Sequence, residues 1–138
     1  MKAIVTLLVS SSFLISCAHT ACDEKQMLSL ADALLLVSSA VESVVRYENA
    51  PDQLEDIALI TYSTRDDPAL IRLFENYYVR ARGVFVGQKK HSHILVCTLN
   101  KNEALLEDIG CTAKMDKLSF RDTARCETTL DVAAICKD

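Results

Sequence analysis

The chain has 138 residues, of which 50% are hydrophobic and 25% charged, and 15 basic against 19 acidic residues give a net charge of −4. This length supports one domain with a real core. The acidic balance disfavours nucleic acid and anionic lipid as partners, and it leaves room for a basic partner. Only 3 glycines and 2 prolines occur, so repeats and flexible linkers are not expected.

The first residues have the pattern of a secretory signal. Lys2 is followed by an apolar run that is too short to cross a membrane. The run ends in Leu14-Ile15-Ser16-Cys17, which resembles the lipobox of bacterial lipoproteins. The resemblance implies cleavage before Cys17 and a lipid anchor on it, attached to the periplasmic side of a bacterial membrane. The alternative is ordinary cleavage after Ala18, which gives a soluble periplasmic or secreted protein.

These signals divide the chain into three parts. We expect a signal peptide at residues 1–16, a short tether at 17–22 and a single domain at 23–138. Without the signal and Cys17, about 121 residues remain, which is enough for one core but not for two. Loss of Lys2 makes the net charge of the exported chain about −5.

The domain begins with helical patterns. Apolar residues recur at helical spacing from Asp23 to about Tyr47 and predict one long helix, whose apolar stripe we expect to face the core. Proline suits the first turn of a helix. A second helix is therefore predicted from Pro51 to about Tyr62, and a short third helix from Pro68 through Phe74.

After the third predicted helix, the spacing of apolar residues changes from that of helices to that of strands. Tyr77–Val86 is rich in strand formers, and Gly83 inside it suggests a bulge. We predict that Gly87-Gln88-Lys89-Lys90 turns this strand into the central strand and so forms a first hairpin. A second hairpin has its turn at Asn100-Lys101-Asn102, between the apolar run 94–99 and the run 104–109. We expect the first run to be a buried central strand and the second to lie nearer an edge, with Glu107 and Asp108 on the solvated surface.

The last segment, Cys126–Cys136, alternates with period two and predicts a final strand. The fold class predicted from these patterns is α+β: N-terminal helices packed on a small, mostly antiparallel four-stranded sheet, cross-linked by disulfides.

An exported chain meets an oxidising compartment, so we expect disulfides among Cys97, Cys111, Cys126 and Cys136. Strand spacing keeps Cys97 from Cys111, and Cys126 from Cys136. We prefer Cys97 with Cys136 and Cys111 with Cys126, a nested pattern, over the crossed alternative in which Cys97 joins Cys126. Cys22 is left over, as a free thiol, an intermolecular bridge or a partner of Cys17.

One basic cluster stands out in this acidic chain and is our candidate partner-binding surface. Its members lie in one predicted hairpin: Arg80, Arg82, Lys89, Lys90, His91 and His93. The plainer interpretation is cross-strand pairing and a solvated turn. His91, His93 and Cys97 would share a strand face, as metal ligands on a sheet do. The disulfide role of Cys97 and the lack of an acidic residue in that strand argue against a metal, and we predict neither a metal nor a cofactor.

The sequence contains no catalytic motif, and it leaves two classes of function open. The preferred one is a non-catalytic envelope protein that binds another protein, such as a small inhibitor or an immunity-type lipoprotein. The alternative is a small ligand carrier or an enzyme whose site is assembled from scattered residues. An enclosed pocket with titratable groups would favour the alternative, and a convex body with a broad exposed patch would favour the first.

Overall fold

The computed structural model describes residues 19–112, 119–120 and 125–137. The expected signal peptide and Cys17 lie outside these residues, and so does the side chain of Cys22. Cleavage and lipidation therefore stay predictions.

The long N-terminal helix is confirmed as α1 (His19–Tyr47), and its first residues belong to the segment expected as a tether. Its apolar stripe is buried: Leu34, Val37 and Val41 are fully covered and pack against the sheet. Residues Glu24–Tyr47 are long and apolar enough to cross a membrane by length and composition. Because this stripe is part of the core, we assign α1 as a core helix.

Two short helices follow, α2 (Asp56–Ser63) and the 3₁₀ helix η1 (Pro68–Phe74). The second predicted helix was wrong at its start, since α2 begins at Asp56 rather than at Pro51. Asp56 has a φ of 53°, which is incompatible with a helix running through it from Pro51. Its carboxylate accepts a hydrogen bond from the backbone N–H of Ala81 at 3.0 Å, so the bend ties the loop to the edge of the sheet.

The sheet is antiparallel, with three long strands, β1 (Tyr77–Val86), β2 (Lys89–Thr98) and β3 (Ala104–Ile109). A two-residue strand, β4 (Ser119–Phe120), pairs with the outer edge of β3. The α+β class and the antiparallel sheet are confirmed.

The predicted turn of the β2–β3 hairpin is also confirmed. Lys101 has a φ of 61°, and the side chain of Asn100 accepts a hydrogen bond from the N–H of Asn102. These are the contacts that asparagine makes in turns.

The predicted bulge at Gly83 was wrong, because Gly83 pairs with Ser92 in regular register. The glycine serves a close approach instead: a Cβ at this position would collide with the side chain of Lys90. The irregularity of the sheet lies between Val96 and Cys97, where β2 meets β3.

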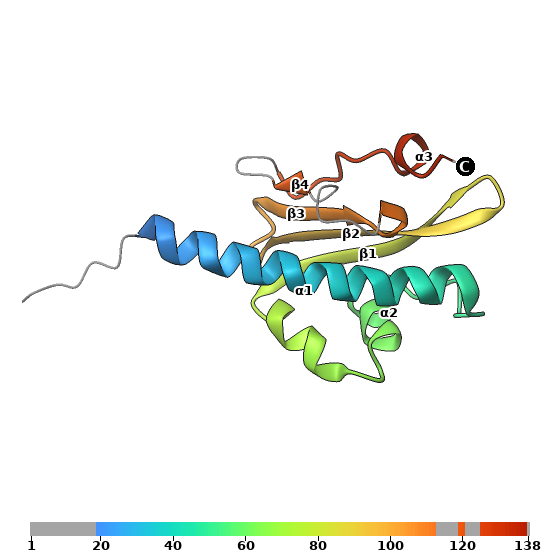
Figure 1. Ribbon diagram of the computed structural model, residues 1–138, viewed down its shortest axis with the longest axis horizontal. Helices are drawn as coiled ribbons and strands as arrows, with labels where there is room; N and C mark the ends of the chain where they lie inside the picture. Colours follow the sequence, from blue (N-terminus) through green and yellow to red (C-terminus); the bar gives the residue numbers. More distant parts are fainter. Residues whose placement is uncertain (1–18, 113–118, 121–124, 138) are drawn as a thin grey trace, which may run out of the picture.

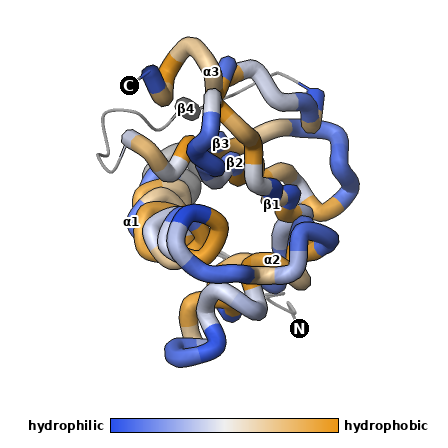
Figure 2. Tube along the Cα trace, turned by 90° about the vertical axis from the view of Figure 1, so that its right-hand side faces the viewer, coloured by the Kyte–Doolittle hydropathy of each residue, from blue (hydrophilic) through white to orange (hydrophobic). Residues whose placement is uncertain are grey.

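The sheet lies between two layers (Figure 1). Helices α1 and α2 cover one face, and residues 125–137, which we call the strap, cross the other; Figure 2 shows the same arrangement from the end. The α1 face of the sheet includes Ile94, Val96 and Leu106 in the main core. The strap face has two smaller clusters, one around Leu95 and one around Ile109.

The final predicted strand, Cys126–Cys136, was wrong. Within its described residues the strap forms no strand; it is irregular and ends in the short helix α3 (Val132–Ile135). Asp131 caps this helix, because its carboxylate accepts hydrogen bonds from the N–H groups of Ala133 and Ala134.

Both disulfides join the hairpin to the strap, but the preferred nested pairing was wrong. The bonds are Cys97–Cys126 and Cys111–Cys136, the crossed alternative, with Cα–Cα distances of 5.7 and 5.8 Å. Nested pairing needs a strap antiparallel to β3. The strap instead runs in the same direction as β3, so its first cysteine meets the start of that strand and its last cysteine meets the end.

We predict that the C97A/C126A double variant unfolds with a free energy about 3 kcal/mol lower than that of the wild type, because the closed loop restricts the unfolded chain. Guanidinium unfolding at pH 7 measures the difference. A non-reducing peptide map of the wild type should contain the 97–126 and 111–136 links. A 97–136 link would contradict this fold.

Candidate functional site

Two histidines of β2 each form a buried pair with a glutamate of another element. His91 and His93 are 4% and 2% exposed. Nδ1 of His91 lies 2.7 Å from Oε1 of Glu42 on α1, and Nε2 of His93 lies 2.7 Å from Oε1 of Glu107 on β3. Both histidines were candidates for a partner-binding surface. Their side chains are instead enclosed, so neither one contributes to the exposed charge of the protein.

The carboxylate of Glu107 fastens the strap to the sheet, and it is fully buried. Besides His93, it accepts hydrogen bonds from the N–H and the hydroxyl of Thr129 and from the N–H of Leu130, at 2.7 to 3.1 Å. Burial by itself raises the pKa of Glu107, but these hydrogen bonds together outweigh burial and lower the pKa to about 2. Glu107 is therefore ionised at neutral pH.

The next residue, Asp108, points to the opposite face of the sheet, toward α1. It is 2% exposed, and within the described residues its Oδ1 has no hydrogen bond of good geometry. Burial raises the pKa of Asp108, and the nearby carboxylate of Glu42 adds to the rise, while the neighbouring hydroxyl of Ser38 opposes it. The Oγ of Ser38 is also buried without a hydrogen bond of good geometry among the described residues.

A groove of about 380 Å³ opens beside these groups, between α1 and the end of β3. We call it the α1 groove. The residues that line it are Leu35, Ser38, Ser39, Glu42, Ser43, Arg46, Tyr47, Asp108, Gly110 and Cys111. Arg46 lies at 3.8 Å from Glu42 and is partly exposed. The groove thus presents two carboxyl groups and several hydroxyls.

Gly110 allows the end of β3 to approach α1 closely. A Cβ there would collide with the hydroxyl of Ser92 and the carboxylate of Glu42. Glu42 also accepts a hydrogen bond from the N–H of Ser92 at 2.6 Å, in addition to its contact with His91. One carboxylate of α1 therefore holds the start of β2.

The four remaining basic residues of the predicted cluster divide between the two faces of the sheet. Arg80 and Arg82 share the strap face with Lys89, as their cross-strand partners show. We call Arg80, Arg82 and Lys89 the cationic face. Lys90 lies on the other face and pairs with Asp52 at 3.1 Å. Arg80 and Arg82 are exposed, and neither side chain forms an ion pair within the part of the chain that the structure describes.

The sequence alone did not indicate Glu42, Glu107 and Asp108 as site residues. Glu42 fell on the polar side of the predicted helix, and the two acids of β3 were assigned to an edge. One sequence signal was present: both acids of β3 stand between apolar residues in a short strand. Such a position is buried when both faces of a strand are covered.

No protein-family model matches this chain, and no curated protein or solved structure shows significant similarity to it. Any function must therefore be argued from the chemistry of the chain itself.

Replacing Glu107 by Gln should lower the free energy of unfolding at pH 7 by about 3 kcal/mol, because it removes a buried charge with charge-assisted hydrogen bonds. A carboxylate whose pKa falls on folding stabilises the native state above its unfolded pKa. For Glu107 this stability is lost as the pH falls from 4.5 to about 2.

Urea unfolding between pH 2 and 7 tests this prediction. The variant should lack that part of the acid dependence, whereas the exposed control Glu103→Gln should behave like the wild type. Equal pH profiles for E107Q and E103Q would contradict the proposed role of the carboxylate.

Asp108→Asn should have the opposite effect and raise the free energy of unfolding at pH 7 by roughly 1 kcal/mol. A carboxyl whose pKa rises on folding makes the native state less stable while it is ionised, and this cost disappears as the pH falls below the ordinary 3.8. Thermal unfolding at pH 7 and pH 3 measures the gain, which should shrink at the lower pH. A loss of stability at pH 7 would show that the carboxylate is structurally satisfied.

Proposed function

We propose that this protein is an exported, lipid-anchored binding protein without catalytic activity, and that it holds an acidic protein partner on the cationic face. The observation that carries this proposal is the pair Arg80 and Arg82. They stand two residues apart on the same face of β1, a strand at the edge of the sheet, and both are exposed and form no ion pair among the described residues, although Glu55 and Asp56 line the hollow beside them. Unpaired charges of one sign attract an oppositely charged surface and steer its approach.

The shape near these arginines favours a protein over a small molecule. The hollow beside Arg80 and Arg82 has a volume of about 100 Å³, well below the several hundred Å³ of typical ligand pockets. A shallow charged surface on an edge strand is better suited to a broad contact. An inhibitor or immunity-type protein of the bacterial envelope fits this geometry.

The two disulfides support the proposal that the chain is exported. Both disulfides link segments 25 or more residues apart, and such bonds are typical of chains that mature in an oxidising compartment. The lipobox-like Leu14-Ile15-Ser16-Cys17 supports an anchor on the membrane. The strands then stand in the periplasm, within reach of an envelope protein.

Charge reversal at Arg80 and Arg82 should reduce partner capture. The wild type and the R80E/R82E variant are immobilised separately, and an envelope extract of the source bacterium is passed over each. Bound proteins are then eluted with increasing salt. We expect the wild type to retain an acidic protein that elutes with salt, and the variant to lose at least 90% of it, since exposed charge pairs govern association.

The matched control is K25E/R72E, which changes the net charge equally on exposed residues of α1 and η1. It should capture as much as the wild type. Equal losses for the two variants, or capture that ignores salt, would refute the role of the cationic face.

The anchor has its own test. Mass spectrometry of the protein from its native membrane should show an acylated N-terminal Cys17, because diacylglyceryl transfer acts on the lipobox cysteine. An unmodified chain that starts at His19 would refute the anchor and leave export intact.

A second candidate function is carriage of a small organic cation in the α1 groove. The observation in its favour is Asp108, a buried carboxyl beside Glu42 at a groove of about 380 Å³. An ammonium group would satisfy the free oxygen of Asp108 and offset the charges of the two acids. Nuclear magnetic resonance shifts at Ser38 and Asp108 on addition of putrescine, absent in D108N, would favour this function.

A further inference from the structure

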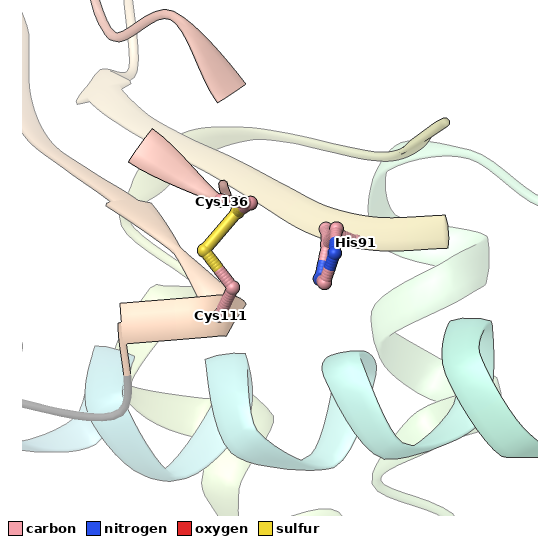
Figure 3. Close-up of side chains that lie close together, drawn as sticks. All are labelled: His91, Cys111 and Cys136. Carbon is pink, nitrogen blue, oxygen red and sulfur yellow. A yellow bond between two sulfur atoms is a disulfide. The ribbon is translucent and has the colours of Figure 1, made fainter. Parts of the chain in front are cut away.

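A histidine lies against one of the two disulfides. A ring nitrogen of His91 and the Sγ atoms of Cys111 and Cys136 all lie within 4.8 Å of one another. Figure 3 shows the imidazole beside the Cys111–Cys136 bond, with a helix running past both. The three side chains come from β2, η2 (Gly110–Thr112) and the end of α3, so the fold brings them together from distant parts of the chain.

We propose that this corner is a redox-controlled zinc site: when a dithiol reductant opens the Cys111–Cys136 bond, Cys111, Cys136 and His91 bind one Zn²⁺. Two thiolates and one imidazole form a donor set that zinc prefers, and the fourth position is left to water or an external ligand. The sequence pattern placed His91 near a cysteine only in the case of Cys97, which is bonded to Cys126. The proposal concerns this chain's own chemistry and does not depend on the partner-binding function.

The redox step balances. A dithiol gives two electrons and two protons to the Cys111–Cys136 bond and becomes a cyclic disulfide, which leaves two thiols on the protein. Zinc binding then forms two Zn–S bonds and releases both thiol protons. While the disulfide is intact, its sulfurs lack the negative charge that makes thiolates strong zinc ligands.

The surroundings of His91 suit a metal ligand. Its Nδ1 is already held by Glu42 at 2.7 Å, and within the described residues no hydrogen bond involves its Nε2. A carboxylate on one ring nitrogen orients a histidine whose other nitrogen binds a metal. Glu42 is in turn fixed by the N–H of Ser92. Because Nδ1 is held by Glu42, Nε2 is the nitrogen left for zinc.

The site is reachable, and the strap has other attachments. Cys111 is only partly buried and lines the α1 groove. The strap also holds to the sheet through Glu107 and through Val132, which packs on Ile109 in the core beneath it. Opening one disulfide therefore leaves Cys136 near its former partner, and the ligands need only small movements.

The test uses the full chain with C17S and C22S, so that the N-terminal thiols do not bind metal. The protein is reduced with dithiothreitol and then freed of it without oxygen. We expect the reduced form to bind one Zn²⁺ per chain and the oxidised form to bind none. With Co²⁺, the reduced form should show thiolate-to-metal absorption in the near ultraviolet.

Variants then identify the ligands. C111S/C136S should abolish binding, and C97A/C126A should keep it. His91→Gln should weaken zinc binding at least tenfold, whereas the matched control His93→Gln, a second buried histidine paired with a glutamate, should stay within twofold. Glu42→Gln should weaken binding about tenfold, as loss of such a supporting carboxylate does.

X-ray absorption on the reduced, zinc-loaded C17S/C22S chain decides the question even if a ligand variant does not fold. Two sulfur ligands at about 2.3 Å and at least one nitrogen at about 2.0 Å support the site. Equal binding by oxidised and reduced protein, equal affinities of H91Q and H93Q, or a reduced chain that unfolds and is not restored by zinc would overturn it.

Discussion

The carboxylate of Glu107 is the contact on which the arrangement of this small domain depends. Its oxygens join β3 to His93 on β2 and to Thr129 and Leu130 of the strap. A buried carboxylate is tolerated only where hydrogen bonds replace its water, and here side-chain and backbone donors do so. The strap provides most of those donors, so its position and the ionised state of Glu107 require each other.

The neighbouring acid, Asp108, shows what happens when that compensation is incomplete. Side chains alternate along a strand, so two consecutive acids of β3 enter two different layers. Glu107 meets the backbone of the strap, whereas Asp108 meets α1, whose own N–H groups are engaged within the helix. The pKa of Glu107 is therefore lowered and the pKa of Asp108 is raised, and carboxyl groups with such perturbed pKa values cluster at functional sites.

Local patterns in the sequence were sufficient for much of the fold. Alternation and turn residues predicted the bounds of β1, and asparagine chemistry predicted the turn around Lys101. The direction of the strap was not predictable in the same way, because residues 126–136 alternate without pairing as a strand. The crossed disulfides follow from that direction.

The candidate sites were harder to predict than the fold, because their residues come together only through packing between distant segments. Arg80 and Arg82 stand out because their exposure follows from local alternation. The groups that meet in the interior come from distant segments: Glu42 and His91 are 49 residues apart, and His93 and Glu107 are 14 apart. A single sequence shows a polar residue on a helix or strand, but it does not show whether another layer will cover that side.

The way the strap is attached determines where the molecule can open. An irregular segment that covers a sheet opens first where it has the fewest restraints. Here Cys136 is covalently bound to Cys111, and Cys126 is bound to Cys97. Thermal opening of the strap therefore has to begin between the two bonds, around Thr129, where hydrogen bonds to Glu107 are the restraint. A protease that cuts only unfolded segments therefore has to cut the strap between Cys126 and Cys136, where both sides of the cut stay bound to the rest of the domain by a disulfide.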